Sequence, residues 1–126
     1  MPTKKLFETC SNLLQRASLR TASFEKTLSE TCEGDFVYLD PPYSVSKRRV
    51  FRQYGPATFG PDDVELLRSW LVRLANRSVK FLVSYAQSKE GQYLAKDFQS
   101  KKIAVRRNIA GFTSSRRLSY ELLISN

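Results

Sequence analysis

The sequence contains no histidine, which excludes histidine-based acid–base catalysis and the common histidine-containing metal sites within this chain. Its two cysteines, Cys10 and Cys32, are too few and too unpatterned for a disulfide framework or a zinc site, so we expect no metal. Long apolar runs are also missing, because polar residues interrupt the stretch 6–14 that follows the basic start. No segment approaches transmembrane length or resembles a signal peptide, which predicts a cytoplasmic protein without a membrane partner.

Positive charge is the unusual feature of the composition. The 126 residues suffice for one domain with a modest core. They include 21 Lys and Arg against 12 Asp and Glu, a formal net charge of +9. This balance suits a polyanion partner, since phosphate contacts supply much of the affinity for nucleic acid. A basic globular domain without such a partner is an equal alternative on charge alone.

The apolar pattern predicts an α/β protein in which a strand–helix–strand–helix order ends in two further strands. An amphipathic helix over 6–17, expected to pack against the rest, precedes a short strand at 20–24 and one or two helical turns at 24–30. The later strands are predicted at 36–39, 79–85, 103–109 and 118–124, and the later helices from Pro61 and from Ser88 to Phe98. Leu28 and Trp70 are expected to face the core, and the helix from Pro61 carries one apolar stripe of Val64, Leu67, Leu71 and Leu74. The last two strands predict a C-terminal β-hairpin.

The strongest candidate site is the tetrad Asp40-Pro41-Pro42-Tyr43, which follows the strand-like run 36–39. The two prolines prevent the strand from continuing, because neither has an N–H and each fixes φ. Pro41 also biases Asp40 to extended geometry, which presents its carboxylate at the carboxyl end of the strand. Ligands of open α/β sheets bind in the crevice at that end. The alternative is an ordinary proline turn with a surface acid.

The stretch 44–61 shows no periodicity, and loops of this length inside a compact domain are uncommon unless they are functional. It interleaves basic and aromatic side chains, a mixture that suits phosphate contacts and base stacking. DNA contact is favoured over a solvated charge cluster for Lys47, Arg48 and Arg49. For aromatic residues such as Tyr54, the sequence favours neither base stacking nor a ring folded into the core.

The motifs resemble those of the Dam-type (D12 class, DPPY motif) DNA adenine-N6 methyltransferases. Residues 36–43, FVYLDPPY, resemble the catalytic motif of that family. Three further matches follow in the family's order: an F-x-x-Y-x-x-x-x-F pattern at 51–59, an FLVS strand at 81–84 and a closing R…ELLI.N at 116–126. The family strand often continues with Asn after this serine, whereas this chain has Tyr85, which puts a polar contact below the site in question.

The resemblance implies transfer of a methyl group from S-adenosylmethionine to adenine N6 in double-stranded DNA, within an incomplete Rossmann-like methyltransferase sheet. It implies that the tetrad is catalytic and that Asp40 also meets the cofactor. It further implies cofactor contacts at Ser23 and Phe24, and DNA contacts at Tyr54, Asn108, Phe112 and Arg116 in addition to the basic loop.

Parts of the family pattern are missing here: the F-x-G-x-G loop for S-adenosylmethionine, the next strand and the target-recognition domain. The chain is therefore predicted to be a single partial catalytic domain, with 1–19 left from the recognition domain and 20–126 as the catalytic segment. A second chain would supply the cofactor-binding half. The edge of the Asp40 strand would otherwise be open, which predicts low stability and a tendency to associate. A non-catalytic DNA-binding remnant, a subunit of a split methyltransferase and, less favoured, an RNA or protein-amide methyltransferase remain alternatives.

Overall fold

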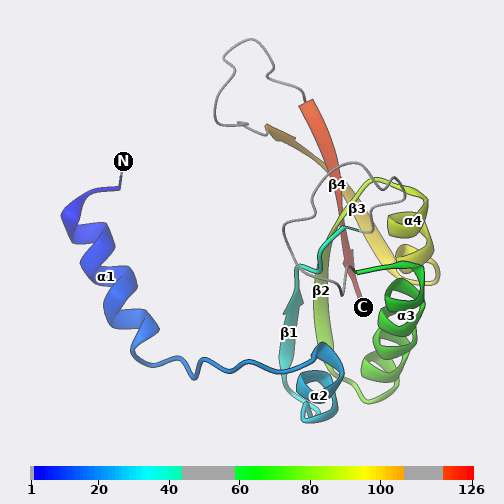
Figure 1. Cartoon of the computed structure of the whole chain (residues 1–126), viewed down its shortest axis with the longest axis horizontal. Helices are drawn as coiled ribbons and strands as arrows, with labels where there is room; N and C mark the ends of the chain where they lie inside the picture. The colour runs from blue at the N-terminus through cyan, green and yellow to red at the C-terminus, as the bar shows by residue number, and fades with distance from the viewer. Residues whose placement is uncertain (1, 44–58, 107–117) are drawn as a thin grey trace.

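The computed structural model describes residues 2–43, 59–106 and 118–126, which build one four-stranded mixed sheet with helices beside it (Figure 1). The strands are β1 (Phe36–Leu39), β2 (Lys80–Ala86), β3 (Gln99–Arg106) and β4 (Leu118–Ser125). Their spatial order is β1-β2-β4-β3, with β1 parallel to β2 and β4 antiparallel to both of its neighbours. The predicted α/β class and the antiparallel pairing of the last two strands are confirmed. The loop between them lies outside the described residues.

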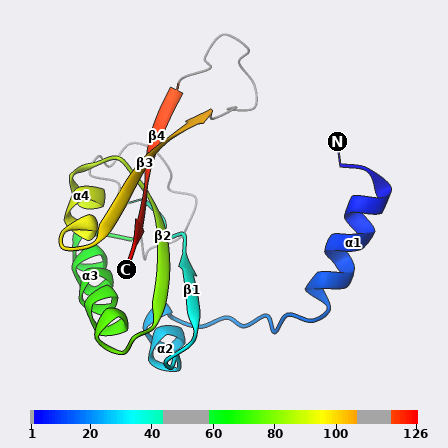
Figure 2. The ribbon, with the colours of Figure 1, turned by 180° about the vertical axis from the view of Figure 1, so that it is seen from behind.

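The described part of the chain contains four helices: α1 (Lys4–Leu14), α2 (Phe24–Ser29), α3 (Pro61–Asn76) and α4 (Lys89–Ala95). α3 begins with proline as predicted, and the N–H of Gly60 just before it donates to the carboxylate of Asp63 at 2.8 Å. Ser88 caps α4, since its hydroxyl accepts from the N–H of Gly91. α3 and α4 lie together on one side of the sheet (Figures 1 and 2).

The core lies between α3, α4 and the sheet. Every residue of the predicted helix stripe is buried: Val64, Leu67, Leu71 and Leu74. The sheet faces this stripe with Phe81, Val83 and Tyr85 of β2 and with Leu122 and Ile124 of β4, all buried. Trp70 is also buried, which confirms its prediction as a core residue.

The predicted strand at 20–24 is wrong, because residues 20–23 form no regular secondary structure and Phe24 starts a helix instead. The hydroxyl of Ser23 accepts from the N–H of Lys26 at 3.3 Å, and its carbonyl accepts from the N–H of Thr27 at 3.2 Å. These bonds satisfy the first donors of α2 and make Ser23 its N-cap. α2 buries Leu28, as the sequence predicts.

The predicted helix over 88–98 is shorter in the structure, and the following strand starts earlier. The last predicted residues of that strand, 107–109, lie outside the described residues. α4 ends at Ala95 because Lys96 leaves helical geometry, with a ψ of 129°, and Asp97 adopts a left-handed φ of 69°. The chain then enters β3 at Gln99, four residues before the predicted start.

α1 forms as predicted, but it does not pack as expected. None of its residues is buried, and Leu6, Phe7, Leu13 and Leu14 are each at least half exposed. Figures 1 and 2 show it apart from the sheet, on the opposite side of β1 from α3 and α4. Helix formation here reflects local signals, such as the Thr3 hydroxyl that accepts from the N–H of Leu6 at 3.3 Å.

Replacing Gly91 with alanine should destabilise the fold, although alanine favours helices. Gly91 is buried in α4, and a Cβ there would collide with the carbonyl oxygen of Ala86 at the end of β2. We expect the free energy of unfolding in urea to fall by about 1–3 kcal/mol. The exposed neighbour Gln92 offers a matched control, because Gln92→Ala should leave stability nearly unchanged. Equal stability of the two variants would contradict the close approach.

Candidate active site

The tetrad lies where the sequence predicts, directly beyond the carboxyl end of β1. Leu39 pairs with Val83 in the parallel register, so the tetrad adjoins Ser84 and Tyr85 near the carboxyl end of β2. Asp40 is exposed. Among the described residues, no hydrogen bond or ion pair engages its carboxylate. This carboxylate is therefore an available hydrogen-bond acceptor at the carboxyl end of β1.

Two residues within the described part of the chain hold Tyr43. Its hydroxyl donates to Oε1 of Glu121 on β4 at 3.0 Å. Its ring meets Tyr85 edge-on, with 5.4 Å between the centroids and 74° between the planes. The other carboxylate oxygen of Glu121 accepts from the hydroxyl of Ser84 at 3.2 Å. The tetrad is thus tied across the end of β2 to the next strand.

Sequence reasoning missed Glu121 and Ser84 as site residues. Both stand in the motifs that carry the family resemblance, at the start of ELLI and the end of FLVS, but the motifs do not reveal that they meet. The departure at Tyr85 is also explained. This side chain is 1% exposed and supports the Tyr43 ring through an aromatic contact, where the family pattern often has an asparagine.

The closing asparagine of the motif supports the sheet. The side-chain oxygen of Asn126 accepts from the N–H of Phe81 at 2.9 Å, and its amide nitrogen donates to the carbonyl of Val79 at 3.0 Å. These bonds hold the start of β2, at the end of the sheet opposite Asp40. Asn126 is therefore a structural residue in this fold.

Ser23 and Phe24, predicted to contact the cofactor, are not brought to Asp40. They begin α2, which lies near the amino ends of β1 and β2, where Arg77 Nη1 donates to the carbonyl of Leu28 at 3.3 Å (Figure 1). Asp40 follows the opposite end of β1. A cofactor role for this pair stays a prediction that rests on the resemblance.

The predicted DNA contacts lie outside the described residues: Lys47, Arg48, Arg49, Tyr54, Asn108, Phe112 and Arg116. Their roles stay predictions. The structure does describe where their two segments are attached. Segment 44–58 follows Tyr43, and segment 107–117 joins the end of β3 to the start of β4.

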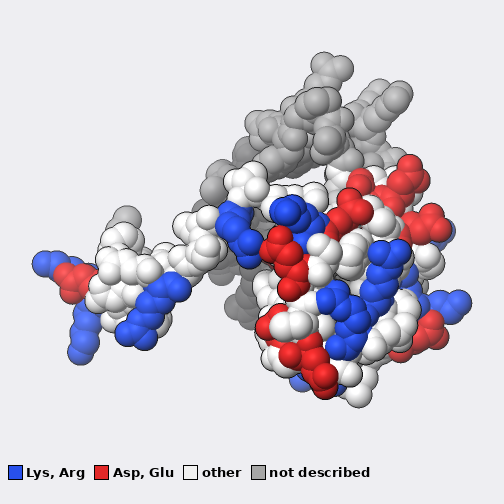
Figure 3. Space-filling view, turned by 90° about the horizontal axis from the view of Figure 1, so that it is seen from below, with Lys and Arg blue, Asp and Glu red and all other residues white. Residues whose placement is uncertain are grey.

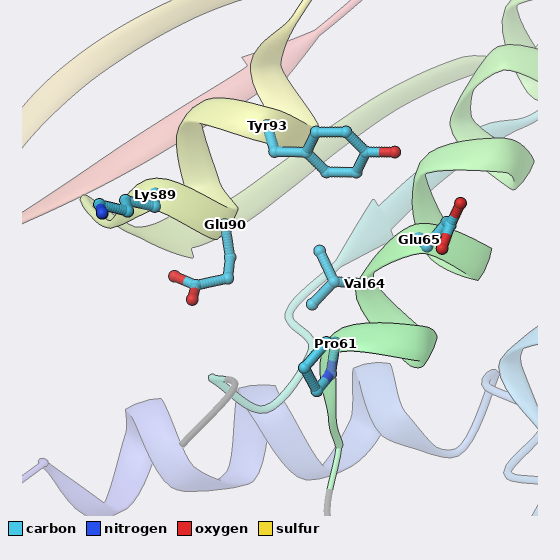
Figure 4. Close-up of a pocket in the computed structure, with 6 residues that line it drawn as sticks. All are labelled: Pro61, Val64, Glu65, Lys89, Glu90 and Tyr93. Atoms are coloured by element: carbon cyan, nitrogen blue, oxygen red, sulfur yellow. The ribbon is translucent and has the colours of Figure 1, made fainter. Parts of the chain in front are cut away.

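A second feature is a shallow cavity of about 370 Å³ between α3 and α4 (Figure 4). It is lined by Pro61, Val64, Glu65, Lys89, Glu90 and Tyr93, and none of the predicted site residues contributes to it. Across the described ranges, no group of three or more acidic or cysteine side chains gathers to hold a metal ion. In the same ranges, no helix has the length and apolarity needed to cross a membrane.

Both cysteines are exposed and unbonded to each other. The hydrogen bond between the Cys32 thiol and the Asp35 carboxylate, at 3.5 Å, raises the pKa of that thiol above its usual value. A raised pKa lowers the thiolate fraction near neutral pH, so Cys32 is a poor candidate for a nucleophile.

Comparison with known proteins agrees with the motifs. The model of the D12 class N6 adenine-specific DNA methyltransferase family matches residues 2–109. Type II methyltransferase M1.LlaDCHI of Lactococcus lactis subsp. cremoris is 34% identical over 98% of this chain and 44% of its own length. Type II methyltransferase M.MjaIII of Methanocaldococcus jannaschii is 31% identical over 92% of this chain and 41% of its own. The chain thus spans less than half the length of these relatives, and it belongs to the D12 class N6 adenine-specific DNA methyltransferase family.

Proposed function

We propose that this chain carries the catalytic corner of an enzyme that methylates adenine N6 in double-stranded DNA, with Asp40 to Tyr43 as its centre. The observation that carries the proposal is the exposed Asp40 carboxylate, presented at the carboxyl end of β1 beside a tyrosine ring that two contacts hold in place. Family membership supports the reaction class. The chain matches less than half of each relative, so we infer that a further polypeptide segment forms the rest of the enzyme.

The proposed chemistry compensates for the low nucleophilicity of adenine N6. Its lone pair is delocalised into the ring, so the amine is a poor nucleophile. The Asp40 carboxylate and the Pro41 carbonyl accept hydrogen bonds from the two N6 hydrogens, which localises the lone pair and orients it for in-line transfer. When bound, S-adenosylmethionine would supply an electrophilic methyl group on its sulfonium. Its methyl–sulfur bond would break as the N6–methyl bond forms, the neutral thioether would leave, and N6 would lose one hydrogen as a proton to solvent. Asp40 also suits a cofactor contact, since its carboxylate is exposed and unengaged in the described structure.

Tyr43 has the complementary role of holding the base. The N6 amine is buried in a DNA duplex, so the adenine must leave the stack before it can react. An aromatic side chain at the site replaces part of the lost stacking, which is worth about 1–3 kcal/mol per base. Tyr43 is half-buried and anchored, so it offers a stacking surface next to Asp40.

The distribution of charge supports DNA approaching the same end of the sheet. Segments 44–58 and 107–117 together contain seven of the 21 basic residues and none of the 12 acidic ones. The remainder of the chain has 14 basic and 12 acidic residues, a net charge of only +2. Both segments join the described fold at the end where Asp40 lies, because β4 runs antiparallel to β2 and starts beside its carboxyl end. By contrast, the face shown in Figure 3 mixes both signs.

The open edge of β1 supports a partner segment that completes the Rossmann-like sheet and the cofactor site. β1 pairs only with β2 among the described strands, and Phe36 and Tyr38 on it are 65% and 58% exposed. The opposite edge strand, β3, carries exposed Lys101 and Lys102, charges that discourage strand addition. The backbone edge of β1 therefore suits a pairing strand from the portion of the enzyme that the longer relatives possess, and the exposed Phe36 and Tyr38 suit a segment that covers their face of the sheet.

Methyl transfer tests the proposal directly. The chain, produced together with the portion of the Lactococcus relative that it does not match, should transfer radiolabelled methyl from S-adenosylmethionine to DNA. Nucleoside mass spectrometry should identify the product as N6-methyladenine. N4-methylcytosine as the product, or DNA binding with no transfer by the complete assembly, would contradict the proposed reaction; the latter result would indicate a DNA-binding remnant.

Calorimetry separates a complete from a split enzyme. We expect S-adenosylmethionine to bind weakly or not at all to the chain alone and to bind measurably once the other portion is present. Equal binding in both titrations would contradict the need for a partner segment, while leaving the reaction itself open to the methylation assay.

A further inference from the structure

We propose that Glu121 is a positioning residue: it sets the plane of the Tyr43 ring through the tyrosine hydroxyl and does not itself touch the base. This inference rests on the proposed function, because it assigns the Tyr43 ring to stacking on an extruded adenine. It goes beyond that function in naming how the ring is oriented and which side chain does it.

The sheet fixes the backbone of Glu121. β4 is an inner strand, and Glu121 pairs with Ala86 of β2 on one side and with Ile103 of β3 on the other. Side chains alternate between the faces of a sheet, so Glu121 points away from the face that carries Leu122 and the core. It is half-buried, and its carboxylate reaches toward the strand end where the tetrad lies.

A carboxylate has the right chemistry for two hydroxyl donors. An ionised glutamate only accepts hydrogen bonds, and among the described residues its two oxygens accept the hydroxyls of Tyr43 at 3.0 Å and of Ser84 at 3.2 Å. Bonds to a charged acceptor are stronger than neutral ones. The Ser84 bond holds the carboxylate in place, and the carboxylate in turn holds the tip of the tyrosine.

The two contacts of Tyr43 act on different parts of the ring. The Glu121 bond fixes the hydroxyl at its tip, and the buried Tyr85 meets it edge-on at 5.4 Å. Together these two contacts, both within the described residues, restrict the ring more than either contact does by itself. Stacking depends on the plane of the ring as well as its position, so loss of the Glu121 bond should weaken base binding without removing the aromatic surface.

The first test uses the chain alone and needs no DNA. With ring-labelled tyrosine, NMR should show a shifted and broadened Tyr43 signal in Glu121→Gln, while the signals of Tyr93 and Tyr120 stay in place. Loss of one signal in Tyr43→Phe assigns the resonance. Glu65→Gln, at an exposed glutamate of α3, is the matched control and should change no tyrosine signal. An unchanged Tyr43 signal, or equal changes in all tyrosines, would overturn the proposal.

The second test asks whether Glu121 acts through the tyrosine hydroxyl. In the complete methylating assembly, Glu121→Gln should lower kcat/KM for DNA about three- to tenfold, mostly through a higher KM, because a charge-assisted bond to the ring is lost. Tyr43→Phe, which leaves the sheet untouched, should produce a similar loss. When Tyr43→Phe is already present, adding Glu121→Gln should lower kcat/KM by a further factor of less than about two, since the bond is already absent.

The outcomes separate this proposal from the proposed function. Multiplicative losses in the double variant, or a loss confined to Glu121→Gln, would overturn the positioning role even if adenine is methylated. An assembly that methylates no adenine would refute the proposed function, and the NMR result would still decide whether Glu121 sets the ring. A released ring with unchanged kcat/KM would refute the inference that its orientation matters to the base.

Discussion

Replacing Asp40 with alanine is expected to lower the rate of adenine methylation by at least about 10²–10³-fold, the range seen when one preorganised hydrogen-bonding group is removed from an active site. The carboxylate is exposed at the end of β1 and no described residue engages it, and no other described carboxylate lies in the tetrad to replace it as an acceptor. Without it, one N6 hydrogen loses its partner and the lone pair stays in the ring. Asp40→Asn, which keeps one acceptor oxygen, should retain part of the activity.

The measurement is the initial rate of methyl transfer by the complete assembly at saturating DNA. Asp62→Ala is a suitable control, because Asp62 is an equally exposed acid at the start of α3 and belongs to no part of the site. DNA affinity measured by fluorescence anisotropy should be nearly unchanged in Asp40→Ala, since removing a negative charge does not weaken phosphate contacts. Methylation that persists in Asp40→Ala at the wild-type rate would refute the assignment.

Leu71→Ala is expected to have the largest effect on stability. Leu71 is fully buried on α3, within the core cluster that joins the helix to β2 and β4. Removing a buried leucine side chain costs about 2–5 kcal/mol, the lost transfer free energy plus the cavity left behind. The total free energy of unfolding of a native protein is only about 5–15 kcal/mol, so we expect the variant to lose much of its folded population under mild denaturing conditions.

The adjacent Val72 is the matched control for this prediction. It lies on the same helix but is 41% exposed, so Val72→Ala should change the free energy of unfolding little. Urea unfolding followed by circular dichroism measures both variants at one protein concentration, so that the association predicted for the open β1 edge would affect them equally. Similar midpoints for the two variants would contradict a core centred on α3.

Much of the fold follows from local patterns. The stripe of Val64, Leu67, Leu71 and Leu74 predicts the buried face of α3, because a 3.6-residue period alone decides which side chains share a face. The end of β1 at Asp40 follows from the two prolines, whose covalent geometry ends a strand in any context. Sequence reasoning failed at 20–24, where the Ser23 cap outweighed a weak strand pattern.

In the candidate site, too, some features follow from the sequence and others depend on the tertiary structure. The tetrad and its position at a strand end were readable in the sequence, as was membership of a methyltransferase family through the ordered motifs. The bond between Tyr43 and Glu121 was not, because 78 positions separate the two residues. It exists because β4 lies between β2 and β3, and strand order depends on long-range pairing that no local pattern encodes.

Exposure was likewise decided by tertiary structure alone. The run 36–39 has the residue types of a buried strand, yet Phe36 and Tyr38 are largely exposed. They alternate with Val37 and Leu39, which pack on the core, so they point to the sheet face that α3 and α4 do not cover. α1 has an amphipathic sequence but buries nothing in the described structure. The amino-acid sequence thus determines which segments become helix, strand and proline turn, since these depend on neighbouring residues. Which apolar faces find a partner, and which side chain orients Tyr43, depends on how distant strands come together.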